Sequence, residues 1–328
     1  MASISKPSRA ARFKIVAMNN IICIAGPTAS GKTALAVEVA KMTNGEVVSC
    51  DSMQIYKRMD IGTAKPTIEE MQGIPHHMID VAEPDEDFSV SRYCEMAGPI
   101  VDDILARGKT AVIAGGTGLY MDSLIRGNDF APFPSTGMRE KLEAQADAEG
   151  MEAMLELLRS IDPDSAARLH LADRKRIIRA LEVYYETGET ITAHNRRTAA
   201  IAPKFDPLWI GIDYVNRQEL YDRIDLRVEL MVKDGLLEEI REVLNSGIPE
   251  KCTAMQAIGY KEFIDAMAGR SSIDEAIAQV QQSSRRYAKR QLTWFRRNEK
   301  VQWLRREPGQ SAEEIFSRAR ALVANFDK

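Results

Sequence analysis

The segment GPTASGKT, at 26–33, constrains the fold more than any other part of the sequence. It matches the pattern G-x-x-x-x-G-K-[ST], in which glycines let successive backbone amides converge on phosphate oxygens. An apolar run, IICIA, precedes the segment. A helical pattern, KTALAVEVAKMTN, begins with the last two residues of the segment, Lys32 and Thr33. The order strand, loop, helix predicts a phosphate-binding loop at the carboxyl end of a buried strand.

The side chains of this loop suit a polyphosphate ligand. Lys32 supplies a positive charge, and Thr33 supplies a hydroxyl for Mg²⁺, which we expect as the cofactor. The pattern does not say which polyphosphate is bound. The expected phosphate-binding residues are Gly26, Pro27, Thr28, Ala29, Ser30, Gly31, Lys32 and Thr33.

The alternation of apolar runs with helical patterns predicts the fold class. GEVVSCD, TAVIA and LWIGIDY each have the length of a buried strand, and a helical stretch from Arg92 to Arg107 separates the first two. This order predicts an α/β fold, a P-loop NTPase-like parallel sheet flanked by helices, with ligands at the carboxyl ends of the strands. The chain from Arg217 onward is predicted to be mostly amphipathic helix.

The segment 130–199 is rich in Ala, Glu, Leu and Arg and has no strand signal, which predicts a helical insertion domain. The core domain is then formed by 21–129 together with 200–328. Residues 1–20 carry basic side chains without an apolar segment, and we expect a disordered tail rather than a targeting peptide.

Composition narrows the setting. With 44 basic and 48 acidic residues the net charge is −4, so a nucleic-acid partner would have to meet a local basic surface. The four cysteines form no CxxC pair, which favours a reducing, cytoplasmic protein without a disulfide framework. No apolar run approaches the roughly 20 residues that span a bilayer, so no membrane partner is expected.

One acidic residue stands out near the phosphate loop. A kinase or ATPase commonly places a Mg²⁺-binding acid at the end of a later strand, but TAVIA is followed by Gly115, Gly116 and Thr117. The acid is instead Asp51, directly after VVSC. That position fits a base that takes a proton from a nucleophile, and the alternative is a turn or helix cap.

Two basic clusters predict contact with a phosphorylated or nucleic-acid substrate. In RRYAKRQLTWFRR, at 285–297, Arg286 and Arg290 share one helical face, and the alternative is a solvated basic surface. In DRKRIIRALEVYYETG, at 173–188, a set of cations opens a helix whose apolar side chains should pack inward. The cations are Lys175, Arg176 and Arg179, and the inward side chains are Ile178, Leu181 and Tyr185.

A third pair of cations, Arg223 and Arg227, is aligned at i and i+4 in YDRIDLRVELMVKDG. The neighbouring acids Asp222 and Asp225 leave pairing within the helix as an equal alternative. His76 and His77 do not share a helical face, and we expect them at a turn or at the edge of the core rather than at a metal.

Seven ordered motifs resemble those of the tRNA dimethylallyltransferases, also called tRNA isopentenyltransferases. The resemblance extends from about Ile21 to Leu304, and the motifs are GPTASGKT, DSMQIYKRMDIGTAKP, PHHMID, AGGTGLY, DRKRIIRALEVY, QAIGYKE and RRYAKRQLTWF. It implies transfer of a dimethylallyl group from dimethylallyl diphosphate to the exocyclic amine of the adenosine 3′ of the anticodon. The tRNAs concerned read codons that begin with U, and diphosphate is released.

The resemblance also implies roles for individual residues. The loop from Gly26 to Thr33 would hold the diphosphate, with Lys32 neutralising charge, Arg223 on the far side, and Arg227 as a weaker candidate. Asp51 would accept the proton of the amine, and Thr117 would lie across the channel from it. Contacts with tRNA would come from Asp51, Ser52, Met53, Gln54, Thr117, Lys175, Arg176, Ile177, Ile178 and Arg179. The insertion domain would clamp the anticodon stem-loop.

Two other enzymes remain as alternatives at this stage, an isopentenyltransferase acting on free adenylate and a P-loop kinase of nucleosides or metabolites. Three basic clusters and the insertion argue against the first, and the missing acid after TAVIA argues against the second. The chain has no Cys/His zinc finger after the basic helix, which resembles the bacterial form of the family. We expect a monomer.

Overall fold

The computed structural model describes residues 20–128 and 136–326. Residues 1–19, nearly all of the predicted tail, lie outside this range, as do residues 130–135 at the start of the predicted insertion. The chain forms two compact units. The core unit comprises Met1–Gly127 and Phe205–Lys328, and the insertion unit comprises Asn128–Lys204.

The core unit is built on a sheet of six strands in the order β3-β2-β4-β1-β5-β6. All adjacent strands are parallel, as the alternation of strands and helices predicted. The central strands are apolar because helices cover both faces of the sheet. The strands are β1 (Ile21–Ala25), β2 (Glu46–Ser49), β3 (His76–His77), β4 (Ala111–Gly115), β5 (Leu208–Tyr214) and β6 (Gln302–Arg306).

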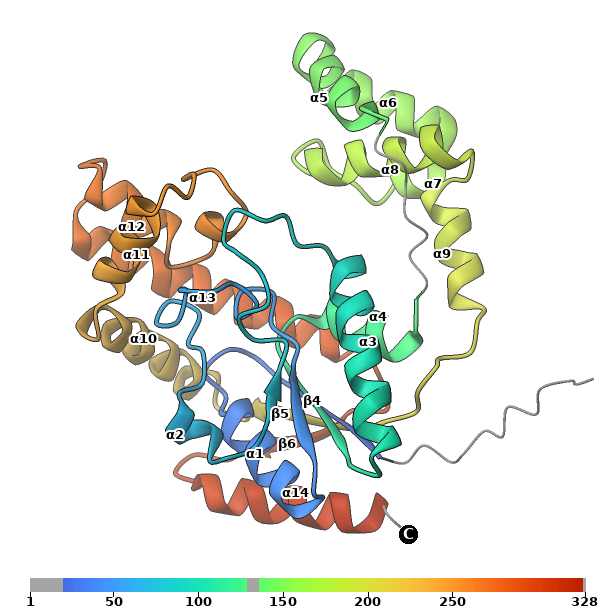
Figure 1. Cartoon of the computed structure of the whole chain (residues 1–328). Helices are drawn as coiled ribbons and strands as arrows, with labels where there is room; N and C mark the ends of the chain where they lie inside the picture. Colours follow the sequence, from blue (N-terminus) through green and yellow to red (C-terminus); the bar gives the residue numbers. More distant parts are fainter. Residues whose placement is uncertain (1–19, 129–135, 327–328) are drawn as a thin grey trace, which may run out of the picture. The chain divides into compact units, whose positions relative to one another are not determined.

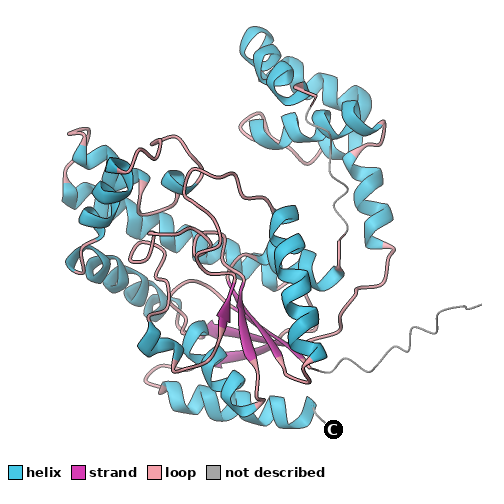
Figure 2. Ribbon diagram, in the orientation of Figure 1, coloured by secondary structure: helices cyan, strands magenta, loops and turns pink. Residues whose placement is uncertain are grey.

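Helices cover both faces of this sheet (Figures 1 and 2). Helices α1 and α14 pack on one face, and α3 and α4 pack on the other. The helices of the core unit are α1 (Lys32–Met42), α2 (Ile68–Met71), α3 (Val90–Ala106), α4 (Gly118–Arg126), α10 (Arg217–Lys233), α11 (Leu236–Asn245), α12 (Lys261–Met267), α13 (Ile273–Phe295) and α14 (Ala312–Phe326). None of the helices in the described ranges is both long and apolar enough to cross a membrane.

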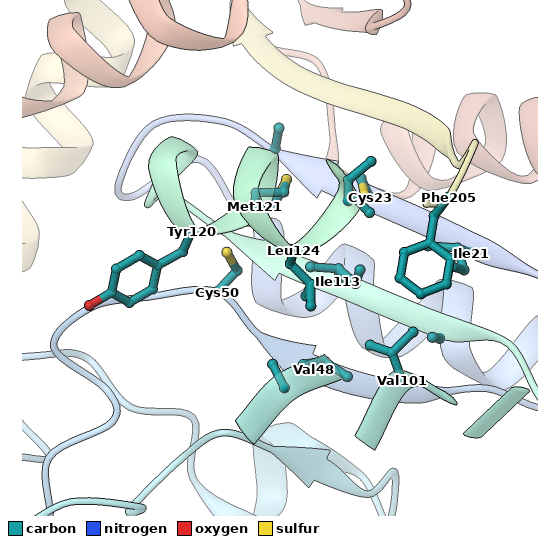
Figure 3. Packing of buried hydrophobic residues seen from close by; sticks show 14 of the residues in the cluster. Ile21, Cys23, Val48, Cys50, Val101, Ile113, Tyr120, Met121, Leu124 and Phe205 are labelled. Atoms are coloured by element: carbon teal, nitrogen blue, oxygen red, sulfur yellow. The ribbon is translucent and has the colours of Figure 1, made fainter. Parts of the chain in front are cut away.

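The largest packed cluster lies between the sheet and helices α3 and α4 (Figure 3). Cys23 and Cys50 are both fully buried in it, and burial raises the pKa of each thiol well above its usual value. These two cysteines therefore serve as small core residues. Their packing fixes the end of β2, immediately before Asp51.

Two strands were not predicted from the sequence. Strand β3 has only two residues, His76 and His77. Strand β6, with the sequence QWLRR, lies at the other edge of the sheet, and only Leu304 is buried in it. An edge strand needs one apolar face at most, so its sequence carries little of the apolar signal that marks a central strand. The chain after Arg217 is mostly helix, as predicted, and β6 is the exception among its described residues.

The insertion unit is entirely helical among its described residues, and it has its own apolar core. Its helices are α5 (Met138–Glu149), α6 (Met151–Ile161), α7 (Pro163–Ala166), α8 (Arg174–Thr187) and α9 (Ile191–Ala199). Ile178 and Leu181 pack into this core as predicted. Tyr185 does not, since 44% of it is exposed, and its ring meets the ring of Tyr184 edge-on.

A buried carboxylate ties three segments together at the amino end of β2. Glu46 is 4% exposed, and it accepts hydrogen bonds from Arg107 at 2.5 and 2.9 Å and from Lys109 at 2.7 Å. Its Oε2 also lies 2.8 Å from Nε2 of His77, which gives this histidine a place at the edge of the core. These partners, the Arg107 bonds above all, hold the pKa of Glu46 well below its usual range.

We expect Glu46→Gln to lower the free energy of unfolding by about 2 kcal/mol at pH 7, because it removes one charge from a buried, paired cluster. A depressed carboxylate pKa stabilises the fold above the unfolded-state value of about 4.3, and this stabilisation is lost as the pH falls through the folded-state pKa. The difference from the unaltered protein should therefore shrink below about pH 4 in urea titrations.

Asp103→Asn is the matched control for this prediction. Asp103 pairs with the same Arg107, but its side chain is 67% exposed, so its loss should cost less than about 1 kcal/mol. Equal costs for the two substitutions, or a cost for Glu46→Gln that does not depend on pH, would contradict the assignment.

Candidate active site

The phosphate loop connects β1 to α1, as predicted. Gly31 has φ of 92°, a left-handed conformation that favours glycine. Gly26 allows a close approach, because a Cβ there would lie 2.9 Å from the carbonyl oxygen of Ile212. The Nζ of Lys32 donates to the carbonyl of Pro27 at 2.6 Å, which folds the lysine back over the loop. The loop is thus closed around the start of α1, where its amides can converge.

Two adjoining cavities meet at this loop. The larger has a volume of about 670 Å³, and α10 and the segment 60–70 form its other walls. The smaller has a volume of about 90 Å³ and contains Asp51. Lys32, Thr33 and Arg227 line both cavities. A ligand held by the phosphate loop would therefore touch both spaces.

Asp51 follows β2 and lines the smaller cavity, which fits the predicted base. Its Oδ1 also accepts hydrogen bonds from the backbone amides of Met53 at 2.9 Å and Gln54 at 3.4 Å. The carboxylate therefore caps a turn, which was one of the two alternatives, and it also lines the cavity in which the predicted base would have to lie. The turn fixes the orientation of the carboxylate through one oxygen only.

Thr117 lies beside this turn. Its Oγ1 accepts from the amide of Ser52 at 3.0 Å and donates to the hydroxyl of Ser52 at 3.3 Å. Gln54 lines the smaller cavity, and its Nε2 donates to the carbonyl of Ala64 at 3.0 Å. The structure thus brings Asp51, Ser52, Gln54 and Thr117 together from two neighbouring strand ends, while the side chain of Met53 packs partly buried against the core.

Arg223 and Arg227 on α10 reach the phosphate loop. The Nε of Arg223 donates to the carbonyl of Ala29 at 3.0 Å, and Nη1 of Arg227 lies 3.5 Å from Oγ1 of Thr28. Asp222 instead accepts from Gln218 on the same helix, and Asp225 pairs with Arg285 on α13. The alternative that the two arginines pair with these acids within the helix is therefore wrong.

Three cations, Lys32, Arg223 and Arg227, lie at the loop, and the acids Asp51, Asp60, Glu70 and Asp234 also line the two cavities. Desolvation lowers the pKa of Lys32 to about 8, an effect that Asp51 opposes and Arg227 reinforces. Desolvation also lowers the pKa of Arg227, and Arg223 adds to this shift. Desolvation and neighbouring cations both make these charges costly, and a bound anion would offset that cost.

Helix α13 forms another wall of the smaller cavity through Tyr287 and Gln291. Burial raises the pKa of Tyr287 to about 12, and Asp51 contributes to the rise, so the phenol stays neutral. The guanidinium of Arg290 lies over this ring, 5.5 Å from its centre. Arg286 and Arg290 are both exposed, which fits a face toward a polyanion and a solvated basic surface equally well.

Reasoning from the sequence missed the residues that hold the segment 60–65. The carboxylate of Glu239 accepts from the amides of Asp60, Ile61 and Gly62 at 2.6, 2.7 and 3.0 Å. The hydroxyl of Tyr260 donates to the same carboxylate at 2.6 Å. Gly62 belongs to the motif DIGTAK and Tyr260 to the motif QAIGYKE. The two motifs pack together here, because only glycine at position 62 leaves room for the Tyr260 ring.

Lys65 was also missed. Its side chain is 6% exposed, and it pairs with Asp60 and Asp80 while donating to the carbonyl of Tyr56 at 2.9 Å. It lines the larger cavity. A lysine on an irregular loop gives no periodic signal, so the sequence could mark it only through the motif around it.

The predicted tRNA-contacting range 175–179 lies on α8 of the insertion unit. Ile177 and Ile178 are 0% and 1% exposed in the core of this unit, so their assignment as contact residues is corrected. Lys175 and Arg176 are exposed, and Arg179 pairs with Glu182 at 2.7 Å. In this range, the side chains that remain candidates for contact with a ligand are therefore those of Lys175, Arg176 and Arg179.

Comparison with known proteins agrees with this geometry. A family model described as IPP transferase matches residues 54–298, and one described as Isopentenyl transferase matches residues 19–86. The tRNA dimethylallyltransferase of Acetivibrio thermocellus is 45% identical over 94% of this chain and 99% of its own. The chain belongs to the tRNA dimethylallyltransferase family. The family resemblance seen in the seven sequence motifs is thereby confirmed, and it is favoured over the kinase and free-adenylate alternatives.

Solved structures of the family share the fold. The tRNA isopentenylpyrophosphate transferase of Bacillus halodurans has a TM-score of 0.69 at 39% identity, covering 94% of this chain and 98% of the other. A eukaryotic dimethylallyltransferase acting on tRNA has a TM-score of 0.79 at 28% identity, covering 94% and 80%. The P-loop-like parallel sheet is thus the fold of the family.

Burial distinguishes the two arginines of α10. We expect Arg227→Gln to weaken the binding of inorganic diphosphate with Mg²⁺ about 10- to 100-fold, because charge-assisted hydrogen bonds are stronger where water is excluded. Arg223 is exposed, and Arg223→Gln should weaken binding only about threefold. Calorimetric titration measures both, with exposed Arg217→Gln on the same helix as the control. The reverse order of effects would contradict the assignment.

Proposed function

We propose that this enzyme transfers a dimethylallyl group from dimethylallyl diphosphate to the exocyclic amine of the adenosine 3′ of the anticodon in tRNAs reading codons that begin with U. The amine nitrogen forms a bond to the first prenyl carbon, and the bond from that carbon to the diphosphate oxygen breaks. The amine loses a proton to Asp51, and diphosphate leaves. The main support is the position of Asp51 in a small cavity that Lys32, Thr33 and Arg227 also line.

The donor's diphosphate would bind the phosphate loop. Negative charge grows on the diphosphate as the carbon–oxygen bond breaks, and Lys32 and Arg227 line the cavity in which that charge would develop. Desolvation depresses the pKa of both cations, Arg227 adds to the shift of Lys32, and Arg223 adds to that of Arg227. An incoming anion would offset these effects, which supports the assignment. Catalysis then relies on electrostatic stabilisation that needs little rearrangement during the reaction.

Mg²⁺ fits the donor set of this site. Across residues 20–128 and 136–326, no cluster of three or more His, Cys, Asp or Glu side chains could hold a metal by itself. A Mg²⁺ ion held by the hydroxyl of Thr33 and by diphosphate oxygens needs no such cluster. When bound, the ion neutralises charge on the leaving group.

Asp51 would act late in the reaction. The amine of adenine is a very weak acid, but it acidifies steeply as its bond to carbon forms, so a carboxylate held in place suffices as the base. The turn bonds to Met53 and Gln54 use Oδ1. We therefore propose that the other carboxylate oxygen of Asp51, Oδ2, accepts the proton from the amine.

The acceptor adenosine must leave its stack in the anticodon loop to reach this cavity, at a cost of a few kcal/mol. Contacts elsewhere on the tRNA would offset that cost. The exposed Arg286 and Arg290 on α13 and the cations of α8 are suited to phosphate contacts, and we assign the insertion unit to the anticodon stem-loop. A cytoplasmic monomer remains our expectation.

A labelling assay tests the function. The protein is incubated with labelled dimethylallyl diphosphate or γ-labelled ATP, and with unmodified tRNA, AMP or a nucleoside as acceptor. We expect label from the prenyl donor in tRNA alone. Prenylation of AMP but not of tRNA would indicate the free-adenylate enzyme, and transfer from ATP would indicate a kinase; either result would overturn the proposal.

We expect Asp51→Asn to reduce turnover by about 10²- to 10⁴-fold while both substrates still bind, because an amide cannot accept the proton. The side-chain oxygen of asparagine still accepts from Met53 and Gln54, so the turn should persist. Single-turnover rates and equilibrium binding separate the two effects, with the exposed Asp85→Asn as control. Turnover within threefold of the unaltered enzyme would remove Asp51 from the base role.

We expect Lys175→Ala combined with Arg176→Ala to weaken tRNA binding and to reduce its salt dependence, because each lost phosphate contact lowers the slope of log K against log salt by about 1. The KM for the prenyl donor should not change. Arg159→Ala, an exposed cation on α6 of the same unit, serves as control. An unchanged salt slope would show that this face of α8 does not contact tRNA.

A further inference from the structure

Gln291 is a buried amide in the middle of α13. It is 4% exposed, and it lies on the apolar face of the helix with Ala288, Leu292 and Phe295. An amide on a buried face costs free energy unless its donors and acceptors are paired. Neither the family motifs nor the basic cluster of α13 explains why a polar residue occupies this position.

The contacts of Gln291 join two loops that are far apart in the sequence. Its Oε1 accepts from the backbone amide of Thr28 in the phosphate loop at 2.8 Å. Its Nε2 donates to the carbonyl of Gly116 at 3.1 Å. Since Thr28 offers a donor and Gly116 an acceptor, only this orientation of the side-chain amide satisfies both.

The glycine at 116 is required by this contact. A Cβ there would lie 2.0 Å from Nε2 of Gln291, so any larger residue would push the two apart. The next residue is Thr117, whose hydroxyl binds the amide of Ser52, directly after Asp51. A chain of hydrogen bonds and one peptide bond thus connects the loop that would hold the donor to the turn that holds the base.

We propose that Gln291 is a positioning residue that sets the separation between the diphosphate-binding loop and the Asp51–Thr117 side of the site. This inference rests on the proposed prenyl transfer, because it concerns the distance between donor carbon and acceptor nitrogen. Displacement at carbon is sensitive to that distance, and a misplacement of about 1 Å can cost 10²-fold in rate. A single side chain that fixes both loops controls this distance directly.

Two substitutions at position 291 separate positioning from folding. Gln291→Met keeps the size and removes both hydrogen bonds at every pH. Gln291→Glu keeps an oxygen that accepts from the amide of Thr28. When this glutamate is ionised, however, its other oxygen places negative charge against the carbonyl oxygen of Gly116. When protonated, it donates an O–H to that carbonyl and restores both bonds.

Other charged and titratable groups line the cavity around position 291 and act in both proteins. They are Lys32 on α1, Asp51 after β2, Arg227 on α10 and Tyr287 on α13. Their effects on the pH profile cancel in the ratio of the rate of Gln291→Glu to that of the unaltered enzyme, except for their influence on the new carboxyl itself. This ratio therefore reports the titration at position 291.

The experiment measures single-turnover rates on unmodified tRNA between pH 6 and pH 8.5, and binding of donor and tRNA separately. We expect both variants to lose at least tenfold in rate at pH 8, about 1.4 kcal/mol, with binding changed less than threefold. The deficit of Gln291→Glu should shrink at least threefold toward pH 6, whereas that of Gln291→Met stays constant. Gln282→Met and Gln282→Glu, exposed on the same helix, are the matched controls.

Rates within threefold of the unaltered enzyme in both variants would overturn the inference. Equal deficits without pH dependence, accompanied by lower melting temperatures, would show a role in folding alone and would also overturn it. A loss confined to donor binding would make Gln291 a binding residue instead. An unaltered enzyme that does not prenylate tRNA would refute the proposed function, so the two failures can be told apart.

Discussion

The concentration of positive charge at the phosphate loop is the constraint on which the rest of the site depends. Lys32, Arg223 and Arg227 converge on one loop, and Asp51 is the carboxylate that shares the smaller cavity with Lys32 and Arg227. Desolvation and mutual repulsion already lower the pKa of Lys32 and of Arg227. Such an arrangement is stable only because the fold holds it, and it favours a ligand that brings negative charge.

Holding the cations in place requires that the surrounding loops be fixed by buried polar groups. Glu239 and Tyr260 secure the segment 60–62, which forms part of the wall opposite α10. Gln291 secures the phosphate loop against the turn at Gly116. Both devices come from the helices that follow β5, so the second half of the chain completes a site whose phosphate loop lies in the first half.

The sequence predicted those parts of the fold and site that depend on local patterns. Strands β1, β2, β4 and β5 each contain a short apolar run, and the phosphate loop has a spaced motif, so each could be recognised within about ten residues. Edge strand β6 and the contacts of Gln291 and Glu239 could not be. Gln291 contacts Thr28 across 263 positions, and no local pattern encodes such a pairing.

One signal for Gln291 was nevertheless present in the sequence. Positions 288, 291, 292 and 295 form a helical stripe, and three of them are apolar while the fourth is an amide. A polar residue on a buried stripe must find partners, so it marks a place where a helix meets backbone groups rather than side chains alone. Asp51 also has its side chain held by backbone groups, because Oδ1 accepts from the amides of the turn that follows β2. A carboxylate fixed in this way keeps its other oxygen for the proposed proton transfer, so the turn cap supports the proposed catalytic role instead of competing with it.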